Sequence, residues 1–377
     1  MQIPFSRPSL GEHEAEAVAR AVRENRIGGN GEICRRVEAL LAQLTGSPHA
    51  LLTPSATQAM DVAFYAFGIE PGDEVLMPSF AFVSQANAIL ARGARPVFCE
   101  IDPQTLNMCP IDAAARITPR TRMIMPVHYA GVACDLDAFE DLARRKDLIL
   151  FEDAAQCIGS RHRGRALGTI GDAGCYSFHE TKNVVAGEGG CLFLRDDRLA
   201  AAAEIIREKG TNRGAFMRGE IDRYTWVGPG GSYVISDLLA ALLEAQLERL
   251  EEITRERTRI WNIYHAGLEA LEKDGLLVRP FIPSYAEHNA HIYAFRARTR
   301  GLRAHLLSGL AARGIRATLH FQPLHTAPYA LERLGTPSRL RETDAAAETL
   351  VRLPLYRDLS PAQAEAIVEN VVELCEE

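Results

Sequence analysis

Short apolar runs alternate with helical segments between residues 49 and 152, and this rhythm restricts the fold more than any other feature. Gly, Pro or Asp bounds each run, as at the ends of strands. The runs are His49–Leu52, Glu74–Met77, Pro96–Cys99, Met123–Val127 and Leu148–Glu152, and the helical segments among them are Thr57–Phe67, Val83–Arg92 and Leu136–Arg145. Such alternation predicts an α/β fold with a mostly parallel sheet covered on both faces.

The pattern in the second half of the chain predicts a smaller domain of a different fold class. Ala173–Phe178 and Gly190–Leu194 extend the first sheet, and a long helix capped by Ser236 then continues to about Leu271. Beyond it the pattern predicts two strands and two helices, at His291–Arg298, Ile315–Leu319, Arg303–Arg313 and Pro361–Leu374. We therefore predict a large α/β/α domain over residues 1–250 and a small α+β domain over residues 251–377.

Composition excludes several classes of function. The net charge of -7 and the pI near 5.9 argue against a surface that binds nucleic acid. No uncharged apolar stretch is long enough to cross a membrane, and Met1–Leu10 lacks the pattern of a secretory signal. The 8 cysteines stand singly, without metal or redox spacing. We expect a cytoplasmic protein with reduced thiols and no catalytic metal.

An acid and a lysine are predicted to meet at one edge of the sheet. Asp153 follows the apolar run Leu148–Glu152, and Lys182 follows the strand that ends near Phe178. The carboxyl ends of parallel strands are where open α/β folds bind ligands. Pyridoxal phosphate needs this pair, because a lysine amine forms a Schiff base with its aldehyde and an acid keeps its ring nitrogen protonated. Asp153 and Lys182 fit these two tasks.

A phosphate site is predicted nearby. Pro54-Ser55-Ala56-Thr57 joins a strand to a helix N-terminus, whose free N–H groups and dipole favour an anion, and Ser177 adds a hydroxyl. Each signal alone is weak, since a Ser or Thr before a helix is more often only a cap and an isolated Asp or Lys is more often solvated. Their order and common position at the sheet edge strengthen the joint interpretation.

The chain resembles the sugar aminotransferases of the DegT/StrS family from its N-terminal arm to its last helix. The segments that carry the resemblance are Ile3-Pro4-Phe5-Ser6-Arg7-Pro8, Leu52-Thr53-Pro54-Ser55, Pro71-Gly72-Asp73-Glu74-Val75, Met77-Pro78-Ser79-Phe80, Pro126-Val127-His128-Tyr129-Ala130-Gly131, Glu152-Asp153-Ala154-Ala155-Gln156 and Ser177-Phe178-His179-Glu180-Thr181-Lys182-Asn183. The resemblance implies a pyridoxal-phosphate-dependent aminotransferase of fold type I, with Lys182 as the residue that binds the cofactor covalently and shuttles the proton.

The resemblance also implies roles for other residues of the cofactor site. Phe82 would stack on the cofactor ring, Gln156 would lie near the ring hydroxyl, and Ala56, Thr57 and Ser177 would hold the phosphate. Family members form homodimers with shared active sites, so Ser232 would reach the phosphate bound by the partner chain. This chain departs from many members here, since they have Asn and Arg at the positions of Ser232 and Val234.

Three residues are predicted to contact substrate. His320 and His325 match the family's substrate-facing loop in the second domain, although an isolated His is more often a hydrogen-bonded core or surface residue. Tyr129 ends a predicted strand, where ligand contact and packing are equally expected. By resemblance the enzyme would use L-glutamate to aminate a nucleotide sugar, converting dTDP-4-keto-6-deoxy-D-glucose to dTDP-4-amino-4,6-dideoxy-D-galactose and releasing 2-oxoglutarate.

Other functions stay open to different degrees. A different 3-keto or 4-keto nucleotide sugar would suit the same motifs, and a non-catalytic regulator could keep the fold and bind the cofactor without turnover. The family's dehydratases replace the lysine with histidine, so the presence of Lys182 disfavours that activity. A nicotinamide-dependent dehydrogenase would need a Gly-x-Gly-x-x-Gly turn, which Pro54-Ser55-Ala56-Thr57 does not supply.

Overall fold

The computed structural model describes residues 2–335 and 339–377, and at its centre lies a seven-stranded sheet of order β1-β9-β8-β5-β4-β2-β3. Every pairing from β3 to β8 is parallel, whereas β9 runs antiparallel to both of its neighbours, β8 and β1. The strands are β1 (His49–Thr53), β2 (Glu74–Pro78), β3 (Arg95–Cys99), β4 (Thr121–Ile124), β5 (Ile149–Asp153), β8 (Ala173–Ser177) and β9 (Gly190–Leu194). The prediction of a mostly parallel sheet is confirmed, and β9 makes it mixed.

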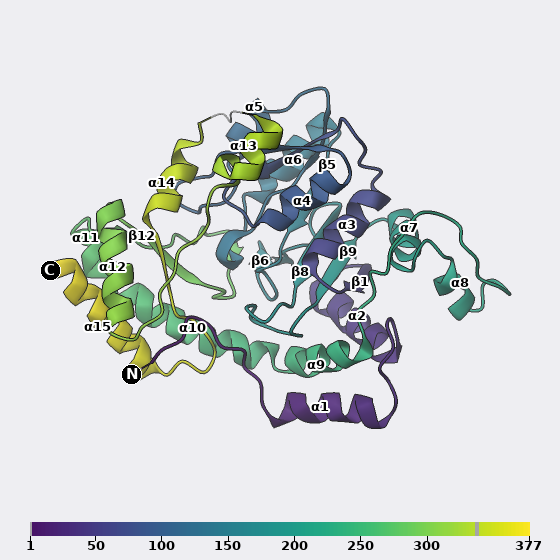
Figure 1. The fold of residues 1–377 in the computed structure, drawn as a ribbon, viewed down its shortest axis with the longest axis horizontal. Helices are drawn as coiled ribbons and strands as arrows, with labels where there is room; N and C mark the ends of the chain where they lie inside the picture. Colours follow the sequence, from purple (N-terminus) through teal and green to yellow (C-terminus); the bar gives the residue numbers. More distant parts are fainter. Residues whose placement is uncertain (1, 336–338) are drawn as a thin grey trace.

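Helices cover both faces of this sheet, which explains why its strands are apolar on both sides. In β9, Cys191 and Phe193 face one core while Leu192 and Leu194 face the opposite core. Helices α2, α5, α6 and α9 cover the first face, and α3, α4 and α7 cover the second (Figure 1). These helices are α2 (Glu32–Thr45), α3 (Ala56–Ala66), α4 (Val83–Ala91), α5 (Pro110–Ala115), α6 (Leu136–Lys146), α7 (Asp197–Arg207) and α9 (Asp237–Glu248), and α1 (Glu12–Arg23) packs outside α9.

The second part of the chain forms its own core around an antiparallel sheet of order β10-β12-β13. The strands are β10 (Leu277–Val278), β12 (Tyr293–Ala297) and β13 (Leu350–Leu353), and the helices are α10 (Leu250–Gly267), α11 (Glu269–Lys273), α12 (Arg300–Ala312), α13 (Pro328–Leu334), α14 (Arg341–Thr349) and α15 (Pro361–Glu376). Ile3 packs into this second core, so the N-terminal arm crosses from one part of the molecule to the other. Both termini lie at this end (Figure 1).

Two predicted elements differ from the structure. The long helix expected from Ser236 is interrupted at Arg249, where φ is -104° and ψ is 8°, and the guanidinium of Arg249 turns to the Glu14 carboxylate of α1 at 2.6 Å. The predicted strand Ile315–Leu319 is wrong. This segment makes only single bridges, from Ile315 to Ile3 of the irregular N-terminal arm and from Thr318 to Arg352 of β13, and neither bridge extends into a ladder. The domain boundary at residue 250 stays a prediction.

Two features lie outside the main layers. A small sheet of order β11-β6-β7 pairs Ala286–Glu287 with Arg161–His162 and thereby joins the two parts of the chain, β7 being Arg165–Ala166. Helix α8 (Arg213–Met217) and its flanking loops project from the large domain, far from the second core (Figure 1). Across residues 2–335 and 339–377 none of the helices combines the length and apolarity that a membrane crossing requires.

A buried ion pair holds three elements of the large domain together. Arg207 of α7 is 2% exposed and pairs with Glu38 of α2, and both side chains also bond to the backbone of Leu52 in β1. Removing one partner of such a pair leaves an uncompensated charge in the protein interior, which is strongly destabilising.

We expect Glu38→Gln to lower the free energy of unfolding by about 3 kcal/mol, measured from the midpoint of urea unfolding. Glu32→Gln is the matched control, because Glu32 forms its ion pairs at the surface and should leave the midpoint unchanged. Equal midpoints for the two variants would contradict a stabilising role for the buried pair.

Candidate active site

The register of three strands brings distant segments to one edge of the sheet. Ser177 at the end of β8 pairs with Gly190 of β9, and Gly190 pairs in turn with Thr53 at the end of β1. The turn after Thr53 therefore lies beside the loop after Ser177. Asp153 ends β5, the other neighbour of β8, so the predicted acid, lysine loop and phosphate turn share one edge.

The N-terminus of α3 has the geometry of a phosphate cradle. Ser55 is its N-cap, and its hydroxyl accepts a hydrogen bond from the N–H of Gln58 at 3.2 Å. The helix itself offers no acceptor to the first N–H groups, those of Ala56 and Thr57. The hydroxyl of Thr57 bonds to that of Ser84 at 2.7 Å, which fixes its side chain. Two free N–H groups and the positive end of the helix dipole thus favour an anion here.

Gly190 permits this turn to approach the sheet. A Cβ atom at residue 190 would lie 2.4 Å from the carbonyl carbon of Ser55 and 2.5 Å from the backbone nitrogen of Ala56. Both are backbone atoms, so any side chain would displace the first turn of α3. The absence of a side chain at Gly190 is therefore a condition for the phosphate cradle.

The two carboxylates at the end of β5 face opposite sides of the sheet. Glu152 is fully buried and accepts hydrogen bonds from the backbone of Gly168, Ile170 and Gly171 and contacts His128 at 3.0 Å. Burial opposes ionisation of Glu152, but the His128 contact and these N–H groups outweigh it and lower its pKa. Glu152 is thus a structural anion, which leaves Asp153 as the acid of the opposite face.

Asp153 is held rigidly toward the cavity. Its Oδ1 accepts a hydrogen bond from the N–H of Ala155 at 2.9 Å, and its Oδ2 accepts one from the side-chain amide of Gln85. Both oxygens are therefore fixed in a carboxylate geometry that can accept a further hydrogen bond from a protonated ring nitrogen.

Lys182 projects into the same cavity from the loop after β8. Burial lowers the pKa of its amine, the carboxylate of Asp153 opposes this shift, and Arg352 adds to it. The neighbouring Asn183 anchors the loop, since its amide donates to the carbonyl of Asn289 at 2.9 Å and its oxygen contacts His291 at 2.9 Å. A lysine shifted toward its neutral form and held in place is suited to act as a nucleophile and a base.

A cavity of about 650 Å³ connects these groups and lies between the two domains. Of the predicted site residues, those that line it are Ala56, Thr57, Phe82, Asp153, Gln156, Ser177, Lys182 and His320. Phe82 is 61% exposed, an unusual fraction for a phenylalanine, so one face of its ring is free to stack on a ligand. The structure thus brings most of the predicted site together in one place.

Three predicted residues lie elsewhere. His325 is 3% exposed and contacts the hydroxyl of Ser79 at 2.7 Å and Asp344 at 3.3 Å, so it joins the domains rather than lining the cavity. Tyr129 is buried behind His320, and its hydroxyl contacts the His320 ring at 3.2 Å. Ser232 is exposed and outside the cavity, and its role toward a partner chain stays a prediction.

Several lining residues were not predicted from the sequence, among them Gln85, Arg257, His291 and Arg352. Gln85 and Arg257 lie on helices, where a single polar residue resembles an ordinary surface position. Arg352 gave the best signal, because a charged residue interrupts the apolar run Leu350–Leu355. Charged residues are rarely buried without a specific reason.

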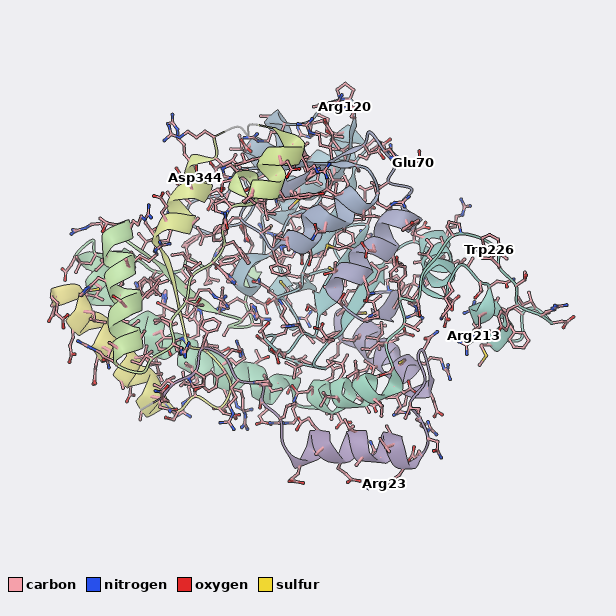
Figure 2. The ribbon with its side chains drawn as sticks, viewed as in Figure 1. Arg23, Glu70, Arg120, Arg213, Trp226 and Asp344 are labelled. Carbon is pink, nitrogen blue, oxygen red and sulfur yellow. The ribbon has the colours of Figure 1, made fainter. Side chains whose placement is uncertain are left out.

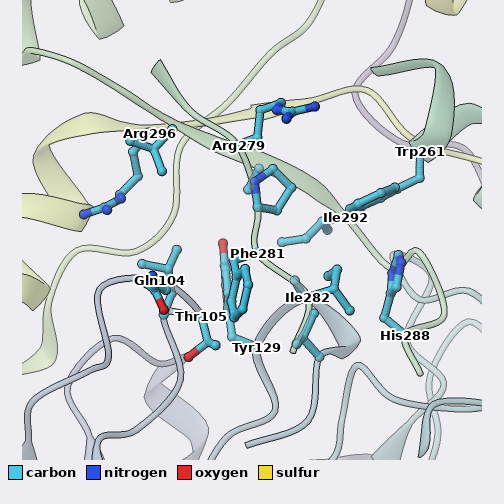
Figure 3. A pocket seen from close by; sticks show the side chains of 16 residues that line it. Gln104, Thr105, Tyr129, Trp261, Arg279, Phe281, Ile282, His288, Ile292 and Arg296 are labelled. Atoms are coloured by element: carbon cyan, nitrogen blue, oxygen red, sulfur yellow. The ribbon is translucent and has the colours of Figure 1, made fainter. Parts of the chain in front are cut away.

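A second crevice at the domain junction is too small for a substrate (Figure 3). Its free space is about 30 Å³, which suffices for a water molecule. Figure 3 shows Tyr129, Phe281 and Trp261 around it, while the guanidinium groups of Arg279 and Arg296 point away from its centre. Within residues 2–335 and 339–377, no three His, Cys, Asp or Glu residues are grouped as metal ligands would be.

Comparison with known proteins identifies the class of this site. Residues 8–372 match the DegT/DnrJ/EryC1/StrS aminotransferase family. The chain belongs to this family. It is similar to the aminotransferase TlmJ from Streptoalloteichus hindustanus, with 32% identity, coverage of 100% of this chain and 99% of that chain, and a TM-score of 0.92.

Two further solved structures show the same likeness. The sugar aminotransferase Spr1654 from Streptococcus pneumoniae, in its PLP form, has 25% identity, coverage of 100% and 99% of the two chains, and a TM-score of 0.91. DesV from S. venezuelae has 29% identity, coverage of 100% and 99%, and a TM-score of 0.89. The predictions of fold type I, of an aminotransferase and of pyridoxal phosphate as cofactor are confirmed.

The residues of this family member fit its cofactor. Pyridoxal phosphate requires three groups, and the cavity provides all of them. They are a lysine with a lowered pKa, an immobilised carboxylate and a helix N-terminus that stays accessible because residue 190 is glycine. Lys182, Asp153 and the Ala56–Thr57 turn would hold its aldehyde, ring nitrogen and phosphate, respectively.

We expect Gly190→Ala to weaken the binding of pyridoxal phosphate to the apoprotein at least about tenfold, because the new Cβ displaces the phosphate turn. The affinity for pyridoxal, which lacks the phosphate, should fall much less. Gly28→Ala is the control, since a Cβ at residue 28 meets no atom within 4 Å. A titration followed by absorbance measures all three dissociation constants, and an equal loss for both ligands would argue against the cradle.

Proposed function

We propose that the enzyme transfers an amino group from L-glutamate to dTDP-4-keto-6-deoxy-D-glucose and is a dTDP-4-amino-4,6-dideoxygalactose transaminase. The observation that carries this proposal is the convergence of Lys182 and Asp153 in one cavity between the domains. Support for a sugar substrate comes from the description of Spr1654 as a sugar aminotransferase and from the motifs quoted above. A different 3-keto or 4-keto nucleotide sugar is the alternative substrate on the same site.

The residues of the cavity have distinct tasks in this reaction. Pyridoxal phosphate, when bound, supplies an aldehyde that carries the amino group and a ring that accepts electrons. Asp153 would hold the ring nitrogen in its protonated form. The amine of Lys182, shifted toward its neutral form by burial, would serve as the base that accepts a proton and the acid that returns one. His320 borders the cavity in a neutral form, because burial lowers its pKa to about 2.

Lys182 and Asp153 are both present in the cavity, which favours an enzyme over a regulator that only binds the cofactor. We also propose that the protein works in the cytoplasm, since all 8 cysteines are free thiols and most are buried.

A homodimer is part of the proposal. The projecting arm around α8 exposes several large apolar side chains, and Figure 2 shows Trp226 and Arg213 on it. Its exposed apolar residues are Phe216, Met217, Tyr224, Trp226 and Val227, with Trp226 77% exposed. Such a surface is unfavourable in water unless a partner covers it. In a dimer with shared sites, this arm would bring Ser232 toward the phosphate of the partner chain.

For the activity, we expect glutamate to abolish the visible absorbance of the cofactor-bound enzyme and the keto sugar to restore it. Lys182→Ala should lose amine transfer by at least about a thousandfold, whereas Lys146→Ala, at the surface, should match the parent. If glutamate leaves the absorbance unchanged, the donor is wrong. If glutamate acts but only another keto sugar restores the absorbance, the sugar is wrong.

For the dimer, Trp226→Asp should shift the protein from dimer to monomer at micromolar concentration, because it places a charge in an apolar contact. Sedimentation velocity reports the change. Tyr329→Asp, which alters another exposed aromatic residue, should leave the dimer intact. A dimer unaffected by Trp226→Asp would show that the arm is not the contact.

A further inference from the structure

Arg352 is a buried cation that lines the active-site cavity and lacks a counter-ion. Its side chain comes from β13 and is only 9% exposed. One terminal nitrogen contacts the ring of His320, the guanidinium carbon lies 4.6 Å from the centre of the Phe5 ring, and the Nε atom is buried without a hydrogen-bond partner. Because an unpaired charge inside a protein is costly, a buried guanidinium at the cavity wall favours the binding of an anion.

A second buried arginine shows how the protein can provide a counter-ion from its own residues. Arg207 is 2% exposed and pairs with Glu38, whereas neither Arg352 nor Arg257 forms an ion pair with any residue in the described ranges 2–335 and 339–377. Burial lowers the pKa of Arg352 to about 10 and that of Arg257 to about 9, so both stay protonated at neutral pH. The two arginines therefore keep their charge without protein carboxylates.

The cavity lining as a whole carries more positive than negative charge. Its lining holds Lys182 and both arginines, but Asp153 is committed to Gln85 and Ala155. Glu188, the other lining carboxylate, is largely exposed and lies beside His179. The guanidinium of Arg257 donates hydrogen bonds to the carbonyl oxygens of Ala290 and His291. Among the cationic groups that line the cavity, the Nε of Arg352 is the buried donor that lacks a partner in the described residues.

We propose that Arg352 binds a carboxylate of the amino donor, with the charge of Arg257 supporting it. This inference rests on the proposed function and identifies the acidic donor's own binding group. The cofactor phosphate has a separate cradle on α3 in the large domain, whereas Arg352 belongs to the second domain.

The surroundings of Arg352 favour a carboxylate over the diphosphate of the nucleotide sugar. Phe5 lies against the guanidinium, and the stacked rings of His320 and Phe321, 3.9 Å apart, form a flat neighbouring wall. A planar carboxylate can lie along this flat wall while it accepts two hydrogen bonds from the guanidinium fork.

Binding of glutarate, which has the carboxylates of glutamate but no amine to react, tests this assignment on the cofactor-loaded enzyme. By isothermal titration calorimetry we expect Arg352→Gln to bind glutarate about thirtyfold more weakly than the parent. Arg352→Lys should recover part of the loss, because it restores the charge but not the planar fork. Arg316→Gln, an exposed arginine near the same strand, should bind glutarate within about twofold of the parent.

A parallel titration with dTDP separates the two anions. The affinity for dTDP should be the same in the parent and in Arg352→Gln, and the cofactor absorbance of each variant verifies that its site is folded. A loss of dTDP affinity with unchanged glutarate affinity would overturn the proposal in favour of a diphosphate site. Unchanged affinity for both ligands would also overturn it.

The same measurements keep this inference apart from the proposed function. If the parent binds glutarate through Arg352 but glutamate fails to donate its amine, the carboxylate site stands and the proposed donor fails. If glutamate donates its amine at the parent rate in Arg352→Gln, the proposed function stands and the inference fails.

Discussion

The antiparallel strand β9 is the constraint on which the active site depends. By lying between β8 and β1, it sets Ser177, Gly190 and Thr53 side by side, so that two loops distant in sequence meet at one sheet edge. The close approach is possible only because Gly190 has no side chain to strike the first turn of α3. The register of the sheet therefore positions both the lysine loop and the phosphate turn.

The cavity differs from the interior of the large domain in how its buried charges are paired. Inside the large domain, Arg207 and Glu152 are each matched by groups of opposite character, Glu38 for the arginine and three N–H groups with His128 for the glutamate. In the cavity, Arg257 and Arg352 form no ion pair with any described residue. A site that keeps positive charge unpaired suits the proposed reaction, in which the cofactor, the donor and the acceptor would all bring negative charge.

Much of this could be predicted from sequence, and the failures have identifiable physical causes. Local patterns located the seven strands of the large sheet and the pair Asp153 and Lys182, because both residues closely follow apolar runs. The direction of β9 depends on which strands it pairs with, and no local pattern records that. His325 matched a motif, but its environment is set by Ser79, 246 residues away. Gln85 and Arg257 are site residues only because the fold brings α4 and α10 to the same cavity.

The two domains are coupled through the lysine loop itself. Asn183, next to Lys182, holds Asn289 and His291, and Arg257 fastens the same segment through the carbonyl oxygens of Ala290 and His291. Any movement of the second domain therefore acts on the position of the Lys182 amine. It also moves Arg352, whose strand pairs with β12 directly after this segment. Consequently, a ligand anion that satisfies Arg352 would also stabilise the arrangement in which Lys182 faces Asp153, which links donor binding to the geometry of proton transfer.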